Sequence, residues 1–243
     1  MFSWFKRIES VSGPTLKVDI HSHLLPGLDD GVKTFDESLN IIRHFKELGY
    51  SALVTTPHIM EDLYRNTPST INKKLTELKS QLLINNIDFK VEAAAEYYLD
   101  EALMKYLHTN ERLLTIKGNY LLFETNFVNE PFNLNEFIFL ALTKGYKLIL
   151  AHPERYLYLY NNIKKAEDLI NRGVLFQVNM SSLTGYYSKE AQSTAYKLID
   201  RGWVHWLGSD CHHIKHAELI RTAQKNKYFQ KAINLPLLNN SLQ

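Results

Sequence analysis

The chain repeats one pattern along most of its length: an apolar run that ends abruptly in a polar residue. The runs are LKVDIHSH (16–23), SALVTTPH (51–58), FKVEAAAE (89–96), YLLFE (120–124), YKLILAH (146–152), VLFQVNMSS (174–182) and VHWLGSD (204–210). Near-continuous apolar runs are typical of parallel strands that are covered on both faces. Their polar ends fall about 28 to 38 residues apart, which fits one strand and one helix per repeat.

Helix signals lie between these runs. Thr34 and Glu37 form a predicted capping box, ahead of a helical stripe of apolar residues. A glycine stands where a predicted helix ends and the next strand begins, at Gly49, Gly145, Gly173 and Gly202. Seven such units predict an α/β fold, a (β/α)7 TIM-like barrel, with a doubly wound open sheet as the alternative. We predict a single domain over residues 1–243, with an N-terminal arm (1–16) and a C-terminal tail (234–243).

Composition excludes several functions. The net charge is +2 and the cations are dispersed, which argues against a nucleic-acid-binding surface. Apolar runs such as FIFLAL (137–142) are too short to be a transmembrane segment, and the start MFSWFKRIES is not a secretory signal. That start could instead be an amphipathic anchor or a partner-binding arm. The single cysteine, Cys211, fits a reducing environment, so we predict a cytoplasmic protein.

Nine residues that can bind metals follow the predicted strands. In a barrel of parallel strands, catalytic groups lie at the carboxyl ends of the strands. Because residues two apart on a strand point to the same side, His21 and His23 should face one pocket. Imidazole and carboxylate ligands favour Mn, Fe or Zn, and their number implies two or three ions. The candidate ligands are His21, His23, Asp30, His58, Glu96, Glu124, His152, Asp210 and His212.

Taken singly, several of these residues have ordinary structural explanations. His21 and His23 could be hydrogen-bonded strand residues, and Glu96 could lie on the surface. The run from His152 to Arg155 could be a turn held by an ion pair. Glu124 is harder to explain in this way, because an unpaired carboxylate at the buried end of a strand is costly. Nine such residues at successive strand ends favour a metal cluster.

Together these motifs resemble the PHP (polymerase and histidinol phosphatase) superfamily. VDIHSH, TTPH, AHPER and SDCHH are most similar to the bacterial manganese-dependent protein-tyrosine phosphatases of capsule and exopolysaccharide clusters. The resemblance covers residues 17–215. It implies a distorted PHP-type barrel and three ions, with attack on phosphorus by a hydroxide that bridges two of them. It also implies a phosphotyrosine protein as substrate, specifically the tail of a bacterial tyrosine kinase.

The resemblance assigns roles to individual residues. Arg155 would bind phosphate and stabilise the leaving group. The implied ligand sets are His21, His23, Glu96 and Asp210 for one ion, Glu96, Glu124 and His152 for the second, and Asp30, His58 and His212 for the third. A second arginine of some relatives is missing here, which leaves Lys215 and Arg65 as candidate substrate-binding cations. Aromatic residues after the strand ends could form the wall of a cleft: Tyr97, Tyr98, Phe127, Tyr156, Tyr158, Tyr160, Tyr186 and Tyr187.

Other functions are consistent with parts of the pattern. A PHP phosphatase or phosphodiesterase that acts on a small phosphometabolite, such as histidinol phosphate, would share every ligand. An amidohydrolase also begins with His-x-His, but the lysine expected on its fourth strand is replaced here by Glu124. A regulatory binding module on a decayed barrel would not need an intact ligand set. Cys211 lacks the Cys-x5-Arg motif of thiol phosphatases, so we expect it to be a buried bystander.

Overall fold

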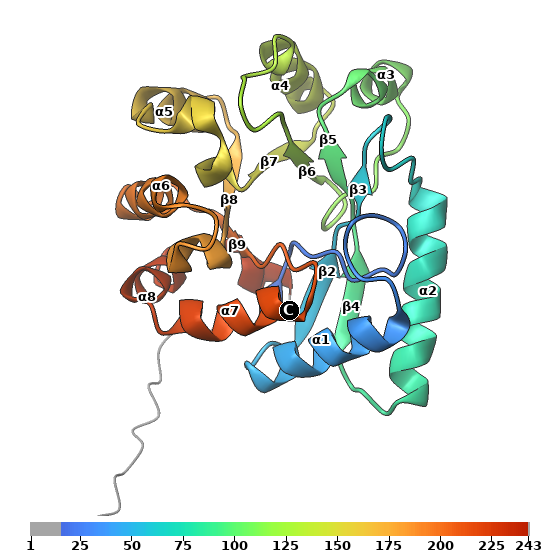
Figure 1. Ribbon diagram of the computed structural model, residues 1–243. Coiled ribbons are helices and arrows are strands. Elements are labelled where there is room, and N and C mark those ends of the chain that lie inside the picture. The colour runs from blue at the N-terminus through green and yellow to red at the C-terminus, as the bar shows by residue number, and fades with distance from the viewer. Residues whose placement is uncertain (1–15, 243) are drawn as a thin grey trace, which may run out of the picture.

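The computed structural model describes residues 16–242 and shows a ring of parallel strands surrounded by helices (Figure 1). The predicted N-terminal arm lies outside the described residues apart from Leu16, as does the suggested anchor. The strands are β1 (Val18–Asp19), β2 (Ala52–Thr55), β3 (His58–Ile59), β4 (Lys90–Ala93), β5 (Glu96–Tyr98), β6 (Tyr120–Glu124), β7 (Lys147–Ala151), β8 (Leu175–Asn179) and β9 (Trp206–Gly208).

The strands form two parallel sheets that together make seven positions in the ring. Their orders are β1-β2-β4 and β3-β5-β6-β7-β8-β9. The predicted strand 51–58 is divided into β2 and β3, and the predicted strand 89–96 into β4 and β5. Pro57 lies at the first break and has no backbone N–H to donate to a ladder. The register is nevertheless the same on both sides, with Thr55 paired to Ala93 and His58 paired to Glu96.

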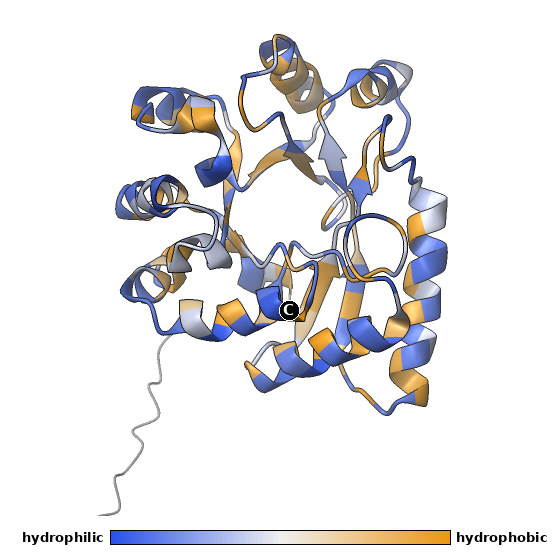
Figure 2. Cartoon of the chain, viewed as in Figure 1, coloured by the Kyte–Doolittle hydropathy of each residue, from blue (hydrophilic) through white to orange (hydrophobic). Residues whose placement is uncertain are grey.

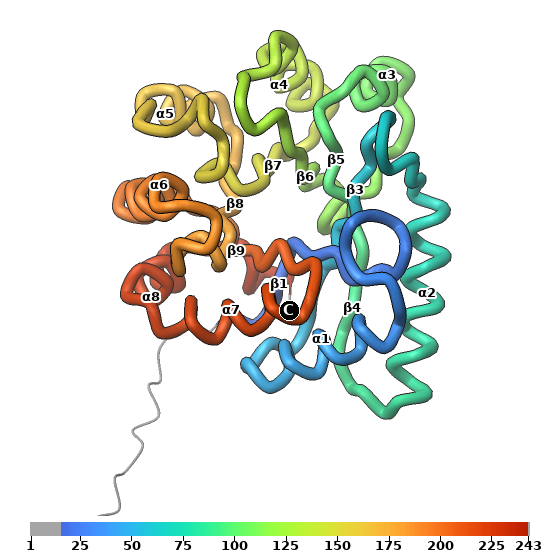
Figure 3. The backbone as a smooth tube through the Cα atoms, viewed as in Figure 1, coloured from blue at the N-terminus to red at the C-terminus, as the bar shows by residue number. Residues whose placement is uncertain are grey.

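The ring is closed between its first and last strands. Ser22 and Cys211 form a parallel bridge, and the His23 N–H donates to the Cys211 carbonyl at 2.8 Å. The chain trace shows the two segments side by side (Figure 3). The predicted α/β barrel is therefore confirmed, and the alternative of an open sheet is wrong.

Helices cover the outside of the ring. They are α1 (Phe35–Glu47), α2 (Pro68–Ile84), α3 (Glu101–Thr109), α4 (Leu134–Thr143), α5 (Ile163–Asn171), α6 (Lys189–Asp200), α7 (Ile214–Gln224) and α8 (Lys227–Ile233). The predicted capping box of Thr34 and Glu37 starts α1. Gly49 has a φ of 93°, and the other three predicted helix-end glycines are also left-handed. No helix in residues 16–242 is both long and apolar enough to cross a membrane.

The core has two parts, on opposite faces of the strands. The larger part packs the strands against the helices, through residues such as Phe45, Phe123 and Phe176. A smaller cluster takes the alternate strand positions, including Leu122, Ile149 and Trp206. Figure 2 shows hydrophobic residues concentrated on the strands and on one stripe of helices such as α1. Apolar side chains therefore fill the body of the barrel, and the polar strand ends gather at one rim.

Candidate metal centre

All nine candidate ligands lie together at the carboxyl-terminal rim of the barrel. His21 and His23 follow β1, and one ligand stands on or directly after each of β3, β5, β6 and β7. Asp30 comes from the loop after β1, and Asp210 and His212 follow β9. Their ligand atoms fall into four groups, each with all atoms within 4.8 Å of one another. These groups are His23, Asp30, His58 and His212; His21, His23 and Glu96; His21, His152 and Asp210; and His58, Glu96 and Glu124.

Glu96 is the centre of the cluster. Its carboxylate is fully buried, and its Oε2 lies 3.0 Å from His21 Nε2 and 3.4 Å from His23 Nε2. The same oxygen is 3.2 Å from His58 Nδ1, and Oε1 is 3.2 Å from His152 Nε2. One carboxylate thus contacts four imidazoles from three other strand positions. That geometry suits an oxygen ligand shared between neighbouring cations.

A second carboxylate lies at the mouth of the site. Asp30 is 54% exposed, and its Oδ1 lies 3.6 Å from His58 Nε2 and 3.4 Å from His212 Nε2. The rings of His23 and His212 stack with centroids 4.0 Å apart. Asp30, His58 and His212 are the residues that the family resemblance assigns to one ion. The structure brings them together, and the buried His23 is the fourth member of the same group.

Two candidate ligands occupy unusual backbone conformations. His152 has a φ of 35° and Asp210 a φ of 50°, in the left-handed region that non-glycine residues rarely adopt. Each follows directly on the end of a strand or its extension. Such conformations cost free energy and persist where the surrounding structure enforces them, commonly at functional sites.

The electrostatics favour bound positive charge. Burial opposes ionisation of Glu96, but His21 and His58 hold the pKa of its carboxyl well below its usual range. Burial likewise lowers the pKa of His21, yet Glu96 and Asp210 outweigh it and raise that pKa to about 9. The pKa of Asp210 is also held well below its usual range against burial, first by His21. Carboxylates that stay ionised in the interior require cations beside them, either imidazolium groups or divalent metals.

Unpartnered polar atoms support the fit to metal ions. Glu96 Oε1 and His58 Nδ1 are buried and lack a well-directed hydrogen bond to any of the described residues. Buried polar atoms without partners are rare in proteins. Imidazole and carboxylate donors are those that Mn, Fe and Zn accept. The residues present therefore fit a cluster of divalent ions.

Further residues orient the candidate ligands through hydrogen bonds. The sequence did not identify them as functional. His23 Nδ1 donates to Asp29 Oδ2 at 2.7 Å, and His21 Nδ1 donates to Gln177 Oε1 at 2.7 Å. Gln177 in turn donates to Asn179 Oδ1 at 2.9 Å, and Asn179 donates to Asp210 Oδ2 at 2.7 Å. Because an amide oxygen only accepts, this relay leaves His21 Nε2 free to bind a metal. The repeated Asp29-Asp30 pair and the alternation of Gln177 and Asn179 along β8 were the available signals.

Arg155 stands beside the candidate ligands. Its Nη1 donates to Asp210 Oδ2 at 2.9 Å, and its side chain is 23% exposed. The guanidinium lies over the rings of Phe127 and Tyr187, at 4.6 and 4.1 Å from the centroids. Burial lowers the pKa of Arg155, but Asp210 outweighs it, so this cation stays charged.

Arg155 and six of the nine candidate ligands line one pocket of about 490 Å³, whereas buried His21, His23 and Glu96 do not line it. Phe127, Tyr186 and Tyr187 belong to its wall, whereas the other five aromatic residues predicted for the cleft do not line it. Arg65 lines a neighbouring pocket, where its Nε donates to the Glu61 carbonyl. Lys215 is exposed on α7 and does not line the pocket either. The structure therefore does not bring Arg65 and Lys215 to the candidate site, and His213 and His216 take the α7 side instead.

Cys211 is fully buried beneath the site, and burial raises the pKa of its thiol. A buried neutral thiol is a poor nucleophile. The expectation that Cys211 is a bystander is consistent with this position.

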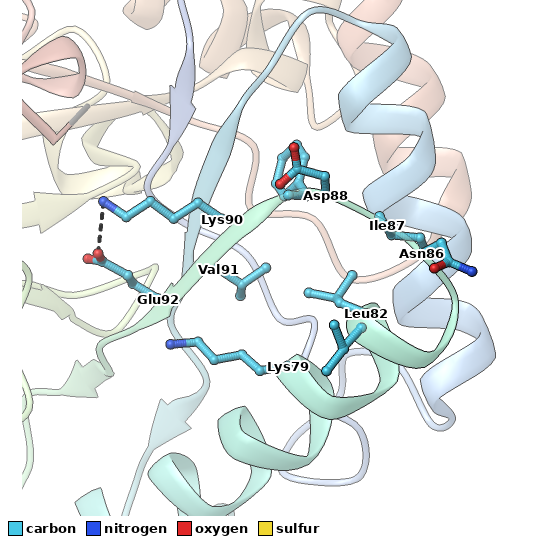
Figure 4. A pocket seen from close by; sticks show the side chains of 10 residues that line it. Lys79, Leu82, Asn86, Ile87, Asp88, Lys90, Val91 and Glu92 are labelled. Carbon is cyan, nitrogen blue, oxygen red and sulfur yellow. Dashed lines mark ion pairs between the residues drawn. The ribbon is translucent and has the colours of Figure 1, made fainter.

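Another pocket, of about 560 Å³, lies between the end of α2 and β4 (Figure 4). Leu82, Ile87 and Val91 contribute apolar surface to it. The Lys90 ammonium is paired with Glu92 at 3.0 Å, as drawn in Figure 4. This pocket contains none of the candidate ligands and no cluster of groups suited to catalysis. The candidate ligands line the slightly smaller pocket at the rim instead.

Comparison with known proteins identifies the family. The family model for capsular polysaccharide synthesis proteins of the CpsB/CapC type matches residues 17–234. The chain belongs to the CpsB/CapC family. The family resemblance seen in the sequence is thereby confirmed.

Relatives in this family are named as phosphatases. A putative tyrosine-protein phosphatase CapC of Staphylococcus aureus is 30% identical over 197 residues, covering 81% of this chain and 77% of the relative. The tyrosine-protein phosphatase YwqE of Bacillus subtilis is 26% identical over 198 residues, covering 82% of this chain and 78% of the relative.

Solved structures agree with the fold. A structure from a study of YwqE of B. subtilis and CpsB of Streptococcus pneumoniae, described as metal-dependent tyrosine phosphatases, matches with a TM-score of 0.81 at 24% identity, covering 92% of this chain and 91% of that one. An amidohydrolase of Mycoplasma synoviae matches with a TM-score of 0.58 at 12% identity, covering 93% of this chain and 87% of that one. The CpsB/CapC chain thus shares its barrel architecture with a metal-dependent phosphatase and, more distantly, with an amidohydrolase.

Proposed function

We propose that this chain is a metal-dependent phosphatase that hydrolyses phosphotyrosine on proteins. The observation that carries the proposal is the convergence of nine imidazole and carboxylate side chains, with buried Glu96 at their centre and Arg155 beside them. Membership of the CpsB/CapC family supports the reaction, because relatives in that family are named tyrosine-protein phosphatases.

The proposed cofactor is a cluster of three divalent ions, with Mn favoured and Fe or Zn as alternatives. Asp30, His58 and His212 would hold one ion, His21, His23, Glu96 and Asp210 a second, and Glu96, Glu124 and His152 a third. Ions bound there would supply Lewis-acid charge to the phosphoryl oxygens and would acidify a water molecule.

The residues of the chain complete the chemistry. Asn179 and Gln177 hold Asp210 and His21 in position. Arg155 would pair with the phosphoryl group and stabilise the departing phenolate oxygen electrostatically. Because its guanidinium stays protonated, Arg155 would not act as a proton donor. A phenolate needs less protonation on leaving than an alkoxide, since the pKa of tyrosine is near ~10.

The biological setting proposed here is a single cytoplasmic domain that acts on the tail of a tyrosine kinase in capsule or exopolysaccharide synthesis. The family description, capsular polysaccharide synthesis, supports this setting. A small phosphometabolite such as histidinol phosphate is the alternative substrate, because it would use the same ligands.

The test is a substrate panel measured with metal-free and manganese-loaded protein. We expect phosphotyrosine peptides to be hydrolysed by the loaded protein, with loss of activity after chelation and recovery on adding Mn²⁺. Histidinol phosphate and a phosphodiester should be turned over far more slowly. Faster turnover of histidinol phosphate would favour the alternative, and a protein that binds no metal would contradict the proposal.

A further inference from the structure

The wall of the candidate pocket contains a phenylalanine, Phe127, that is only partly buried. Phe127 lies in the loop after β6, lines the pocket and is 37% exposed. Its ring packs against one segment of the chain. The ring centroid lies 4.6 Å from the guanidinium carbon of Arg155 and 5.5 Å from the ring centroids of both His152 and Tyr156. Since more than a third of the side chain remains open, burial in the core does not account for its position.

The backbone holds this exposed ring in place. The Asn126 side-chain oxygen accepts hydrogen bonds from the N–H groups of Val128 and Asn129, at 2.8 and 3.0 Å. The Leu157 N–H donates to the Phe127 carbonyl at 2.8 Å. The loop is thus fixed both to itself and to the segment that carries Arg155. A ring held open to solvent in this way is preorganised to bind.

Arg155 contacts aromatic rings from two loops. Its guanidinium carbon lies 4.6 Å from the ring centroid of Phe127 and 4.1 Å from that of Tyr187, which is on the loop between β8 and α6. Tyr186 lines the same pocket and is 48% exposed. The cation expected to meet the phosphoryl group is therefore flanked by aromatic surface.

The geometry of a phosphate ester connects these observations. In an aryl phosphate, one oxygen atom separates the phosphorus from the ring. When the phosphoryl group lies at Arg155, the ring of the ester comes within reach of the Phe127 ring. Aromatic rings in contact lie about 4.5–7 Å apart between centroids. An alkyl phosphate has no ring to place there. We infer that Phe127 is a specificity-determining contact that selects aryl over alkyl phosphates. This inference rests on the proposed function of the same pocket.

The experiment compares two non-hydrolysable ligands on manganese-loaded protein: phenylphosphonate and methylphosphonate. Binding to the wild type and to Phe127→Leu and Phe127→Ala is measured by calorimetry. We expect each variant to bind phenylphosphonate about 3- to 10-fold more weakly, with methylphosphonate unchanged. Phe139→Leu is the matched control, since Phe139 is 73% exposed on α4 and outside the pocket.

Turnover and metal content complete the test. For Phe127→Leu, kcat/KM should fall for a phosphotyrosine peptide but not for the phosphoserine peptide of the same sequence. Manganese content and melting temperature should match the wild type. Equal weakening of both phosphonates, or no weakening of either, would overturn the inference. A wild type that binds phenylphosphonate through Phe127 but hydrolyses no phosphotyrosine peptide would refute the proposed function and leave the ring contact standing.

Discussion

Glu96 organises the site at the scale of single residues. It is buried, it contacts the imidazoles of His21, His23, His58 and His152, and one of its oxygens has no well-directed hydrogen bond to a described residue. A carboxylate in that position is stable only with positive charge around it. The surrounding residues then divide into those that hold the charge and those that act on a substrate.

Arg155 belongs to the second group. We expect Arg155→Ala to lower kcat on a phosphotyrosine peptide by about 10²- to 10³-fold, because a preorganised cation at the developing charge is removed. Manganese content should not change, since Arg155 supplies no ligand. Arg221→Ala is the control, because Arg221 is 53% exposed and pairs with Glu47 on the outer surface. Unchanged turnover with metals still bound would show that Arg155 has another role.

Gln177 acts on the ligands themselves. Replacing it by leucine removes the acceptor that fixes the ring of His21, so we expect Mn²⁺ affinity to fall by about 10- to 100-fold. Titration calorimetry on metal-free protein measures this directly. Gln230→Leu is the matched control, because Gln230 is exposed and donates to the Gln224 carbonyl. Equal affinities in the two variants would contradict the role of the relay.

The sequence predicted the candidate ligands better than their supports. Most candidates follow an apolar run, which places them at the end of a strand, whereas Asp30 comes from the loop after β1. Gln177 and Asn179 lie within such a run. Their alternation shows that both amides are on one face of the strand, but it does not show which ligands they bind. Lys215 was a candidate only through the family resemblance, as a substitute for a second arginine. It is exposed on α7 and does not line the pocket, whereas the next residue, His216, does.

At the scale of elements, a residue near the end of the described chain reinforces the closure of the barrel. Asn239 is fully buried between β1 and β9. Its Nδ2 donates to the carbonyls of Val18 and Leu207 at 2.9 and 2.8 Å, and its Oδ1 accepts from the Leu207 N–H at 3.0 Å. One side chain thus joins the first and last strands at the end opposite the candidate site.

Removing this side chain should weaken the whole fold. We expect Asn239→Ala to lower the free energy of unfolding by about 2–4 kcal/mol, because three buried backbone groups lose their partner. Urea denaturation of metal-free protein measures the effect without a contribution from bound ions. Asn234→Ala is the control, since Asn234 is exposed and bonds only within its own helix turn. Similar stabilities for the two variants would show that Asn239 is not needed for closure.

The elements themselves were largely predictable. The apolar runs, the capping box of Thr34 and the helix-end glycines report local geometry, and all appear in the structure. The division of two strands at Pro57 and at Ala94 was not predicted, because a sheet break depends on hydrogen bonds to neighbours rather than on hydropathy. Asn239 contacts Val18, more than 200 residues earlier in the chain, and one sequence does not reveal such a distant contact.

At the scale of the whole molecule, the barrel separates stability from chemistry. Apolar layers and the contacts of Asn239 lie below, and the charged cluster lies at the carboxyl-terminal rim. His205 belongs to the lower part. Its Nδ1 accepts from the Phe176 N–H at 3.1 Å, and its carbonyl accepts from the Leu238 N–H at 2.9 Å.

His205 should make stability depend on pH. Burial lowers the pKa of His205 below 6.5, so the unfolded chain takes up its proton first as the pH falls. Stability is therefore lost as the pH falls below about 6.5. We expect His205→Asn, which keeps an acceptor but does not titrate, to flatten this loss in urea denaturation between pH 7 and 5. Equal slopes in the wild type and in His205→Asn would contradict the assignment.

Side chains far apart in the sequence should form one metal cluster at this rim. Anomalous scattering at the manganese edge, from crystals grown with Mn²⁺, shows whether they do. We expect manganese peaks enclosed by Glu96, Asp210, His58 and their neighbours. Crystals without manganese peaks at that position, from protein folded as described, would contradict it.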